Sequence, residues 1–359
     1  MRPWIGLDEG SLSAILVGDV NLRNVKDPHL PFALVQDALD GSDVCFANCE
    51  GCYSDPSVEI PYKSGWLHPD RAAVEGLACA GFDAVGCANN VHYGSEAILE
   101  SLSHLDRLGI AHTGAGDSWG SARRPAIVET RGTRFGFLAY TSVFWPVGHA
   151  AGPEQAGVAT IRAHTAYRPH HRVLEMPGAP AIVETWPDAR ELADMESDVR
   201  ALRASVDILL VSCHWGVSGS HETVDYQRAV GRAAIDARAD LVVGHHPHVP
   251  QGVEIYKERV IFYSLGNFMF GWEKMKAQHP EGLMVHGAVR AGKLAKVSAV
   301  PICRNAMGQP QIVSTGGREG KRIIQTVGAL SASMGTELTV HEQEAVVWSE
   351  VEQTANQAP

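Results

Sequence analysis

The sequence predicts an α/β fold in which short apolar strands alternate with helices. Two observations support this prediction. Short runs of apolar residues are each bounded by glycine or polar residues, which is typical of strands that are buried on both faces. Longer segments with helical character lie between these runs. Strands and helices that alternate along a chain favour a layered α/β architecture.

The predicted elements follow in chain order. The strands are expected at residues 14–17, 43–47, 82–86, 208–211 and 241–243. The helices are expected at 31–39, 71–80, 95–108, 191–204 and 223–237. Turn residues predict three hairpins, which pair 126–130 with 135–140, 253–256 with 260–263, and 283–290 with 294–300.

The segments outside this pattern indicate how the chain is organised. Residues 1–320 are expected to form one domain, with a loop-rich insertion at about 141–187. Residues 321–359 are expected to form a C-terminal extension with one strand or helix near 337–351 and a disordered end at 354–359. The insertion could overhang a functional site, and its best contact candidates are Trp145, Tyr167, His170 and His171.

Each predicted strand is followed by polar residues that suit a metal ion. The motifs are Gly-Asp (18–19), Asn-Cys-Glu (48–50), Ala-Asn-Asn (88–90), His-Trp-Gly (214–216) and Gly-His-His-Pro-His (244–248). Two imidazoles on one turn can hold a first-row divalent metal with little further ordering. The carboxyl ends of strands in α/β sheets meet at one rim. The sequence therefore predicts a metal site there, in preference to a histidine-rich surface loop.

Taken together, these motifs resemble the CapA-type family. That family takes its name from poly-γ-glutamate capsule biosynthesis and belongs to the calcineurin-like metallophosphatase superfamily. The resemblance covers roughly residues 11–275, including the segments 251–254 and 263–268. It implies a four-layer αββα sandwich with a metal centre, often binuclear, on one edge. The ligands it implies are Asp19, Glu50, Asn90, His214, His246 and His248. The sequence leaves open whether His245 replaces His246, and whether Asn89 replaces Asn90.

The third motif departs from the family pattern. The usual Asn-Asn-His-x-x-Asp-Tyr-Gly is here Asn-Asn-Val-His-Tyr-Gly (89–94), so His92 is the remaining candidate for a catalytic imidazole. In phosphatase relatives, the histidine directly after the ligand asparagine protonates the leaving oxygen. A shift of one residue moves a side chain by about 3.3 Å, and proton transfer tolerates little misplacement. This departure counts against ordinary phosphoester chemistry.

Three further residues are assigned beside the predicted metal site. Asn21 stands two residues after Asp19, where the family usually has an apolar residue, and is predicted to add a metal contact. Trp215 and Asn267 are candidates for substrate contact, although a tryptophan beside a ligand is more often a packing residue. One or two divalent ions are expected; Mn, Fe, Co, Ni and Zn all suit nitrogen and oxygen ligands.

The seven cysteines raise one alternative. Cys45, Cys49 and Cys52 have the Cys-x3-Cys-x2-Cys spacing of the [4Fe–4S] site in radical S-adenosylmethionine enzymes. The aromatic residue usual before the third cysteine is Gly51 here, and the βα repeats of such a barrel are missing. We interpret the cysteines as reduced core thiols.

Composition excludes several classes of partner. The formal charge of −11 argues against a nucleic-acid or anionic-membrane surface. A hydrophobic content of 45% supports a sizeable core. No run approaches the length of a transmembrane helix and no signal peptide is evident, so a cytoplasmic location is expected.

Two reactions suit such a site. A metal pair can activate water for hydrolysis, or it can stabilise the enolate that forms when a Cα proton leaves. The CapA-type family includes a lasso-peptide epimerase branch, which this chain resembles in its short third motif and its aromatic insertion. The leading prediction is therefore a metal-dependent epimerase acting on a residue, expected to be C-terminal, of a ribosomal peptide. His92 would serve one face of the Cα, and His245 or Asp55 the other. The alternatives are a metallohydrolase of phosphoester or amide bonds and a non-catalytic assembly protein.

Overall fold

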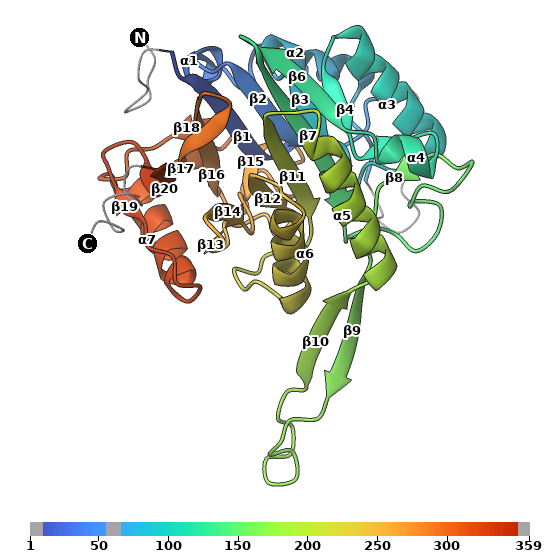
Figure 1. The fold of residues 1–359 in the computed structure, drawn as a ribbon, viewed down its shortest axis with the longest axis vertical. Coiled ribbons are helices and arrows are strands. Elements are labelled where there is room, and N and C mark those ends of the chain that lie inside the picture. Colours follow the sequence, from blue (N-terminus) through green and yellow to red (C-terminus); the bar gives the residue numbers. More distant parts are fainter. Residues whose placement is uncertain (1–9, 55–65, 351–359) are drawn as a thin grey trace.

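Two β-sheets pack face to face at the centre of the protein (Figure 1). The computed structural model describes residues 10–54 and 66–350. The first sheet has the order β19-β20-β17-β16-β1-β2-β3-β4, with β15 beside β1 and β18 beside β17. Its strands are β1 (Leu12–Asn21), β2 (Val44–Cys49), β3 (Ala84–Gly86), β4 (Ala111–Thr113), β15 (Asn267–Phe270), β16 (Glu281–Arg290), β17 (Lys293–Arg304), β18 (Pro310–Ile312), β19 (Thr339–Val340) and β20 (Ala345–Ser349).

The second sheet has the order β13-β14-β12-β11-β7-β6. Its strands are β6 (Ala126–Thr130), β7 (Thr133–Thr141), β11 (Ile208–His214), β12 (Leu241–His245), β13 (Val253–Tyr256) and β14 (Arg259–Phe262). Parallel strands precede the predicted ligands in both sheets. In the first sheet β1, β2 and β3 run parallel to one another, and in the second β11 runs parallel to β12. Their carboxyl ends therefore lie at the same edge of each sheet.

The space between the sheets is filled by alternate residues of both. Phe46 of β2 stacks on Phe137 of β7 across this interface, with ring centroids 4.9 Å apart. Side chains of the opposite parity point outward and pack under helices, as Val17 and Val211 do in the two outer cores. Because every strand in the middle of a sheet is covered on both faces, a nearly continuous apolar sequence is required there.

Helices cover both outer faces. The first sheet packs under α1 (Gln36–Asp40), α2 (Glu75–Cys79) and α3 (Ser95–Arg107), and the second under α5 (Ala189–Arg203) and α6 (Asp225–Asp236). At the other end of the inter-sheet core, α7 (Arg318–Ala332) contributes Ile323, Ile324 and Val327. The order helix, sheet, sheet, helix confirms the predicted four-layer αββα sandwich.

Three local predictions need correction. The helix expected at 31–39 is mostly turns followed by the short α1, and the one at 71–80 begins as a 3-10 turn (Arg71–Val74) before α2. The segment expected to be loop-rich contains a hairpin of β9 (Ala163–Arg168) and β10 (Ile182–Pro187). Only the base of this hairpin packs on the body, against α6, so the hairpin lacks the apolar periodicity that burial imposes on a strand.

The cysteines do not form a cluster-binding set. Cys45 lies near the start of β2 and Cys49 at its end, about 13 Å apart at strand rise. Cys45, Cys49 and Cys52 are all buried. Burial raises the pKa of Cys45 to about 12, although a hydrogen bond with Ser42 opposes this. These are core thiols.

Two predictions concern residues that the structure does not describe. They are Asp55 and the expected disordered end at 354–359. Within the described ranges, no helix is long and apolar enough to cross a membrane.

Candidate metal centre

The predicted ligands meet where the carboxyl ends of strands from both sheets come together. The first sheet supplies Asp19 within β1, Glu50 directly after β2, and Asn90 in the turn after β3. The second sheet supplies His214, the last residue of β11, and His246 and His248 directly after β12. All six belong to short segments fixed by buried strands, so their positions follow from the core.

Asp19 is placed by a close approach of two backbone segments. Its N–H donates to the Gly266 carbonyl over 3.0 Å, and the register between β1 and β2 shifts next to it. The preceding residue is Gly18, where a Cβ atom would lie 2.0 Å from the Gly266 oxygen. Only glycine fits there, so the segment 264–267 can approach β1 at the metal-binding edge.

The Asp19 carboxylate is fully buried among donors. Asn48 Nδ2 donates to its Oδ1 over 2.8 Å, and the His246 N–H donates to its Oδ2 over 3.2 Å. Nδ1 of His245 and of His248 each lie 3.4 Å from one carboxylate oxygen. Burial alone would raise the pKa of Asp19, but hydrogen bonds from His245 and His248 hold it well below the usual range. Asp19 is therefore an anion at neutral pH.

One part of the site has the composition of a metal site. Ligand atoms of Asp19, Glu50 and His248 all lie within 4.8 Å of one another, and all three residues are buried. Burial would lower the pKa of His248, but the charge of Glu50 and the contact with Asp19 raise it above its usual value. The carboxylates thus favour a positive charge in their midst.

A second part of the site adjoins the first. His214 Nε2 lies 3.1 Å from Asn90 Oδ1, and the rings of His214 and His246 have centroids 4.9 Å apart. Burial, and next the neighbouring His246, lower the pKa of His214 well below its usual value, so its imidazole is neutral. Neutral imidazoles and ionised carboxylates are the protonation states that metal binding requires.

Asn48 links the two parts, and the sequence did not single it out. Its Nδ2 lies 2.8 Å from Asp19 Oδ1 and 3.3 Å from His214 Nδ1. A partner of this kind orients both the carboxylate and the imidazole. The available signal was the Asn-x-Glu motif, in which we assigned a role only to the Glu.

The structure distinguishes the two adjacent asparagines. Asn89 Oδ1 accepts the N–H groups of Val91 and His92, and its Nδ2 donates to the Cys49 carbonyl over 2.8 Å. Its side chain therefore stabilises the turn. Asn90 directs its amide oxygen at His214, as a ligand would.

The two adjacent histidines differ as well. His245 is the last residue of β12, fully buried beside Asp19. His246 has φ of +91°, a strained value for a residue with a side chain, and its ring lies between those of His214 and His248. Strain of this kind is often retained at functional sites. The geometry favours His246 over His245 as the ligand.

This assignment gives a first prediction. His246→Ala should lower the metal content of the purified protein by about one ion per chain, because it removes an imidazole from the His214–Asn90 part of the site. His245→Gln, the matched control, should retain full metal content, measured by plasma mass spectrometry. The opposite pattern would show that His245 is the ligand.

Asn21 and Asn267 contact the polypeptide around the site. Asn21 Nδ2 donates to the Glu50 carbonyl over 2.7 Å, and its Oδ1 accepts the Arg23 N–H. Its described contacts fix the chain that carries Glu50, so its role as a direct ligand stays a prediction. Asn267 Oδ1 lies 2.8 Å from His248 Nδ1, the ring atom that also faces the Asp19 carboxylate at 3.4 Å. Its direct contact with substrate also stays a prediction.

His92 and Trp215 lie behind the rim. His92 is fully buried, and burial followed by the neighbouring His68 and His149 lower its pKa to about 3. Its backbone carbonyl lies 3.1 Å from His149 Nε2. Trp215 is also fully buried, and its Nε1 donates to the Tyr263 carbonyl over 2.7 Å. These are surroundings of packing residues, so the catalytic role of His92 and the substrate contact of Trp215 stay predictions.

One candidate in the insertion reaches this rim. Trp145 Nε1 donates to the Asn90 carbonyl over 2.8 Å, beside a predicted ligand. Tyr167 and the His170–His171 pair instead lie in the β9–β10 hairpin or its connecting loop.

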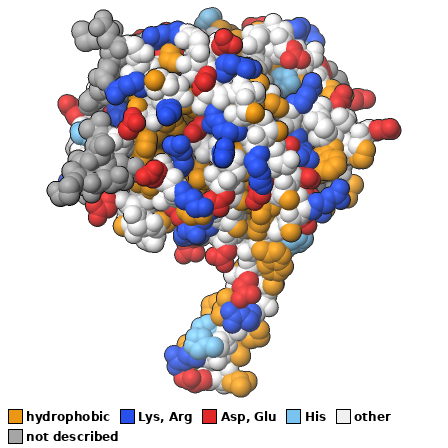
Figure 2. Space-filling model, viewed as in Figure 1, with side chains coloured by type: hydrophobic (Ala, Val, Ile, Leu, Met, Phe, Trp, Pro, Cys, Tyr) orange, Lys and Arg blue, Asp and Glu red, His pale blue; other side chains and the backbone are white. Residues whose placement is uncertain are grey.

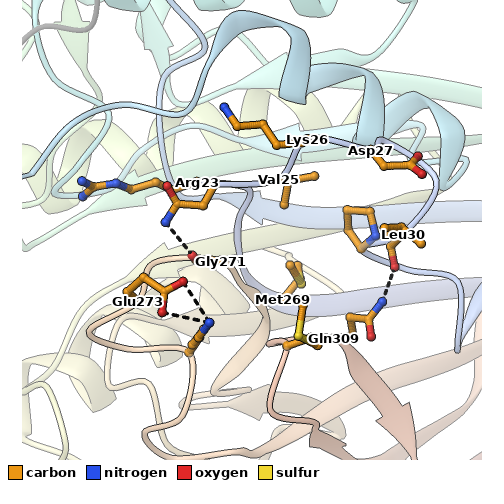
Figure 3. A pocket seen from close by; sticks show the side chains of 13 residues that line it. Arg23, Val25, Lys26, Asp27, Leu30, Met269, Gly271, Glu273 and Gln309 are labelled. Atoms are coloured by element: carbon orange, nitrogen blue, oxygen red, sulfur yellow. Dashed lines mark hydrogen bonds and ion pairs between the residues drawn. The ribbon is translucent and has the colours of Figure 1, made fainter.

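A nearby cavity is distinct from the metal centre. It has a volume of about 460 Å³ and is lined by residues that include Arg23, Leu30, Met269 and Met307 (Figure 3). Met269 belongs to the outer core of the first sheet, whereas the ring of the next residue, Phe270, contacts His248 with centroids 5.5 Å apart. The cavity therefore opens on the opposite face of β15 from His248. None of the predicted ligands lines it.

The donor set fits divalent metal ions. Two carboxylates, an amide oxygen and at least three imidazoles suit first-row divalent metals, and no thiolate is among them. Fold and donor set together define a four-layer αββα sandwich with a candidate metal centre. The chain matches the family described as "Bacterial capsule synthesis protein PGA_cap" over residues 13–272, and it belongs to this family.

Individual relatives agree with this placement. The chain is 31% identical over 304 residues to the uncharacterized protein y4sH of Sinorhizobium fredii, covering 71% of this chain and 65% of that protein. It is 26% identical over 305 residues to the capsule biosynthesis protein CapA of Bacillus anthracis, covering 81% and 67%. The chain thus spans about two thirds of the length of these curated relatives.

A solved structure is also similar. A crystal structure described as a novel phosphatase of Mycoplasma pneumoniae aligns with a TM-score of 0.48 and 14% sequence identity. The alignment covers 82% of this chain and 95% of that one.

Proposed function

We propose that this protein is a metal-dependent hydrolase that cleaves a phosphoester or amide bond. The observation that carries the proposal is the meeting of Asp19, Glu50 and His248 within 4.8 Å, with the His214–Asn90 pair beside them. Membership of the capsule synthesis family supports it.

The residues of the chain prepare the site for water activation. Bound divalent ions supply Lewis acidity, which polarises a substrate oxygen and activates water. Asp19 is kept ionised and His214 neutral by their surroundings. Asn48 and Asn267 hold Asp19, His214 and His248 in place through hydrogen bonds. Such preorganisation lowers the cost of reaching the reactive geometry.

The names of the relatives suggest which amide to test. The protein of Bacillus anthracis is named for capsule biosynthesis, and another relative, in Mycobacterium tuberculosis, is named a probable polyglutamine synthesis accessory protein. We therefore propose a glutamyl polymer as the first amide substrate and an aryl phosphodiester as the first phosphoester.

A specific observation favours a second candidate, peptide epimerisation. Val91 follows Asn90 directly, at the place from which the histidine of phosphatase relatives protonates the leaving group, and it is fully buried in a cluster with Trp66. His92 is buried as well. A reaction at this site therefore gets no proton from that position. Exchange of a Cα proton has no leaving group to protonate, although a base must remove the proton from one face and an acid must return a proton to the other.

One experiment distinguishes the two candidates. Metal-loaded protein is incubated in D2O with a glutamyl polymer, an aryl phosphodiester and linear peptides, and the products are analysed by mass spectrometry. Shorter chains or a released phenol are expected for the hydrolase. A gain of about one mass unit at one residue, with unchanged connectivity, would instead identify Cα exchange. If the metal-loaded protein changed none of these substrates, both candidates would fail for these classes. Asp19→Ala controls for contaminating activity.

A further inference from the structure

The β9–β10 hairpin extends away from the body of the protein (Figure 1). Its strands pair antiparallel, from Ile182 opposite Arg168 at the tip to Pro187 opposite Ala163 at the base. The base is fixed by α6, where the Tyr226 N–H donates to Thr185 Oγ1. A two-stranded hairpin alone in water is marginally stable at best. A partner that covers it would therefore stabilise it.

Apolar side chains are concentrated on this hairpin (Figure 2). Six of the seventeen exposed large hydrophobic residues in the described chain lie between positions 163 and 187. They include Leu174, which is 98% exposed, and Tyr167, which is 74% exposed. Exposed apolar residues that gather on one element mark an interaction surface.

The outer edge of β9 is open to pairing. In the described structure, β9 pairs only with β10, while β10 lies beside α6. Natural edge strands are usually protected by lysine, proline or a bulge, but the sequence of β9 is Ala-His-Thr-Ala-Tyr-Arg. Its one charged side chain, Arg168, is paired with Glu184 across the hairpin at 2.8 Å. The outer edge of β9 therefore presents backbone donors and acceptors, and none of these protective features blocks them.

We propose that β9 pairs antiparallel with β9 of a second copy of this chain, so that two hairpins form a four-stranded sheet. With the two-fold axis at Ala166, Thr165 faces Tyr167 of the other copy, and His164 faces Arg168, so that Arg168 opposes no other Lys or Arg. Cross-strand pairs of β-branched and aromatic residues stabilise antiparallel sheets. The strand thus complements itself, as a two-fold interface requires.

Charge favours a second copy joined at this place. All charged side chains between positions 163 and 187 form ion pairs within the hairpin, whereas the whole chain carries −11. Two such bodies repel each other at short range. A strand of six residues is about 20 Å long, well beyond the roughly 8 Å over which charges act at physiological salt. The hairpins can therefore join while the bodies stay apart.

Sedimentation velocity over a dilution series tests the proposal. The wild-type protein should approach twice 38.6 kDa as concentration rises. Thr165→Lys combined with Ala166→Lys should sediment as a monomer, because the new ammonium groups would oppose each other between copies. Within one chain, position 166 faces Glu184, so the hairpin itself should tolerate the change.

A matched variant controls for added charge. Leu99→Lys combined with Leu108→Lys adds two lysines at exposed apolar positions of α3 and its end, and it should dimerise as the wild type does. Amide hydrogen exchange at 163–168 should slow with concentration in the wild type and in this control, but not in the Thr165/Ala166 variant. A wild-type monomer at every concentration would overturn the proposal, as would a dimer that persists in the Thr165/Ala166 variant. If the wild type is monomeric and the Thr165/Ala166 variant loses turnover of a peptide substrate, the hairpin instead binds peptide.

Discussion

Asp19→Ala is expected to remove bound divalent metal and to lower turnover at least about 100-fold, the loss that even the outer partners of metal ligands can produce. The reason is that Asp19 contacts both parts of the site, through His248 on one side and through Asn48 towards His214 on the other. Metal content is measured by plasma mass spectrometry, and turnover with the substrate found in D2O.

Stability supplies a second measurement that needs no substrate. An ion that binds only the folded state stabilises it by about 2.7 kcal/mol at a hundred times its dissociation constant. A chelator should therefore lower the Tm of the wild type but leave that of Asp19→Ala unchanged. Asp83→Ala is a matched control, because Asp83 accepts the Cys45 N–H over 2.7 Å at the opposite end of the sheet. Asp83→Ala should lose stability but keep its metal. Full metal content in Asp19→Ala would refute the assignment of Asp19 as a ligand.

The layers of the fold could be predicted because burial on both faces leaves a clear signal. Strands such as β11 are buried throughout and begin with an unbroken apolar run, residues 208–211, and helices such as α3 and α6 begin and end within two residues of their predicted limits. The short α1 was predicted to begin too early, since a local pattern does not show where tertiary contacts limit a helix. The segment predicted at 71–80 is helical over 71–79, but its first turn is a 3-10 turn. The β9–β10 hairpin was missed because it has no buried face.

The site was predictable as a set of residues but not as a geometry. Each ligand candidate followed an apolar run, so the sequence indicated the edge of the sheet where they meet. Which of Asn89 and Asn90 faces His214 depends on a turn held by hydrogen bonds from Val91 and His92. The role of Asn48 depends on the distance between strands of different sheets. A one-dimensional pattern does not contain either relation.

Gly244→Ala is expected to destabilise the fold by at least about 3 kcal/mol, the upper part of the usual range for overpacking. A Cβ atom at this position would lie 2.0 Å from the Tyr263 carbonyl oxygen and 2.5 Å from Trp215 Nε1. Both atoms belong to a buried hydrogen bond of 2.7 Å, and the oxygen is part of the backbone. Neither can move aside without opening the end of β12.

The same displacement would reach the metal centre. Gly244 is followed directly by His245 and His246, and its carbonyl accepts the Leu265 N–H over 3.0 Å. Any Gly244→Ala protein that still folds should therefore bind metal more weakly than the wild type. Gly120→Ala is the matched control: this glycine lies in α4 (Trp119–Ala122) with no atom within 4 Å of the added carbon. Alanine there should be neutral or stabilising by up to about 1 kcal/mol. Denaturant unfolding of both variants gives the comparison. Equal unfolding midpoints for the two variants would mean that β12 and the segment after β14 are not packed as closely as the structure places them. The position of His246 would then need a different explanation.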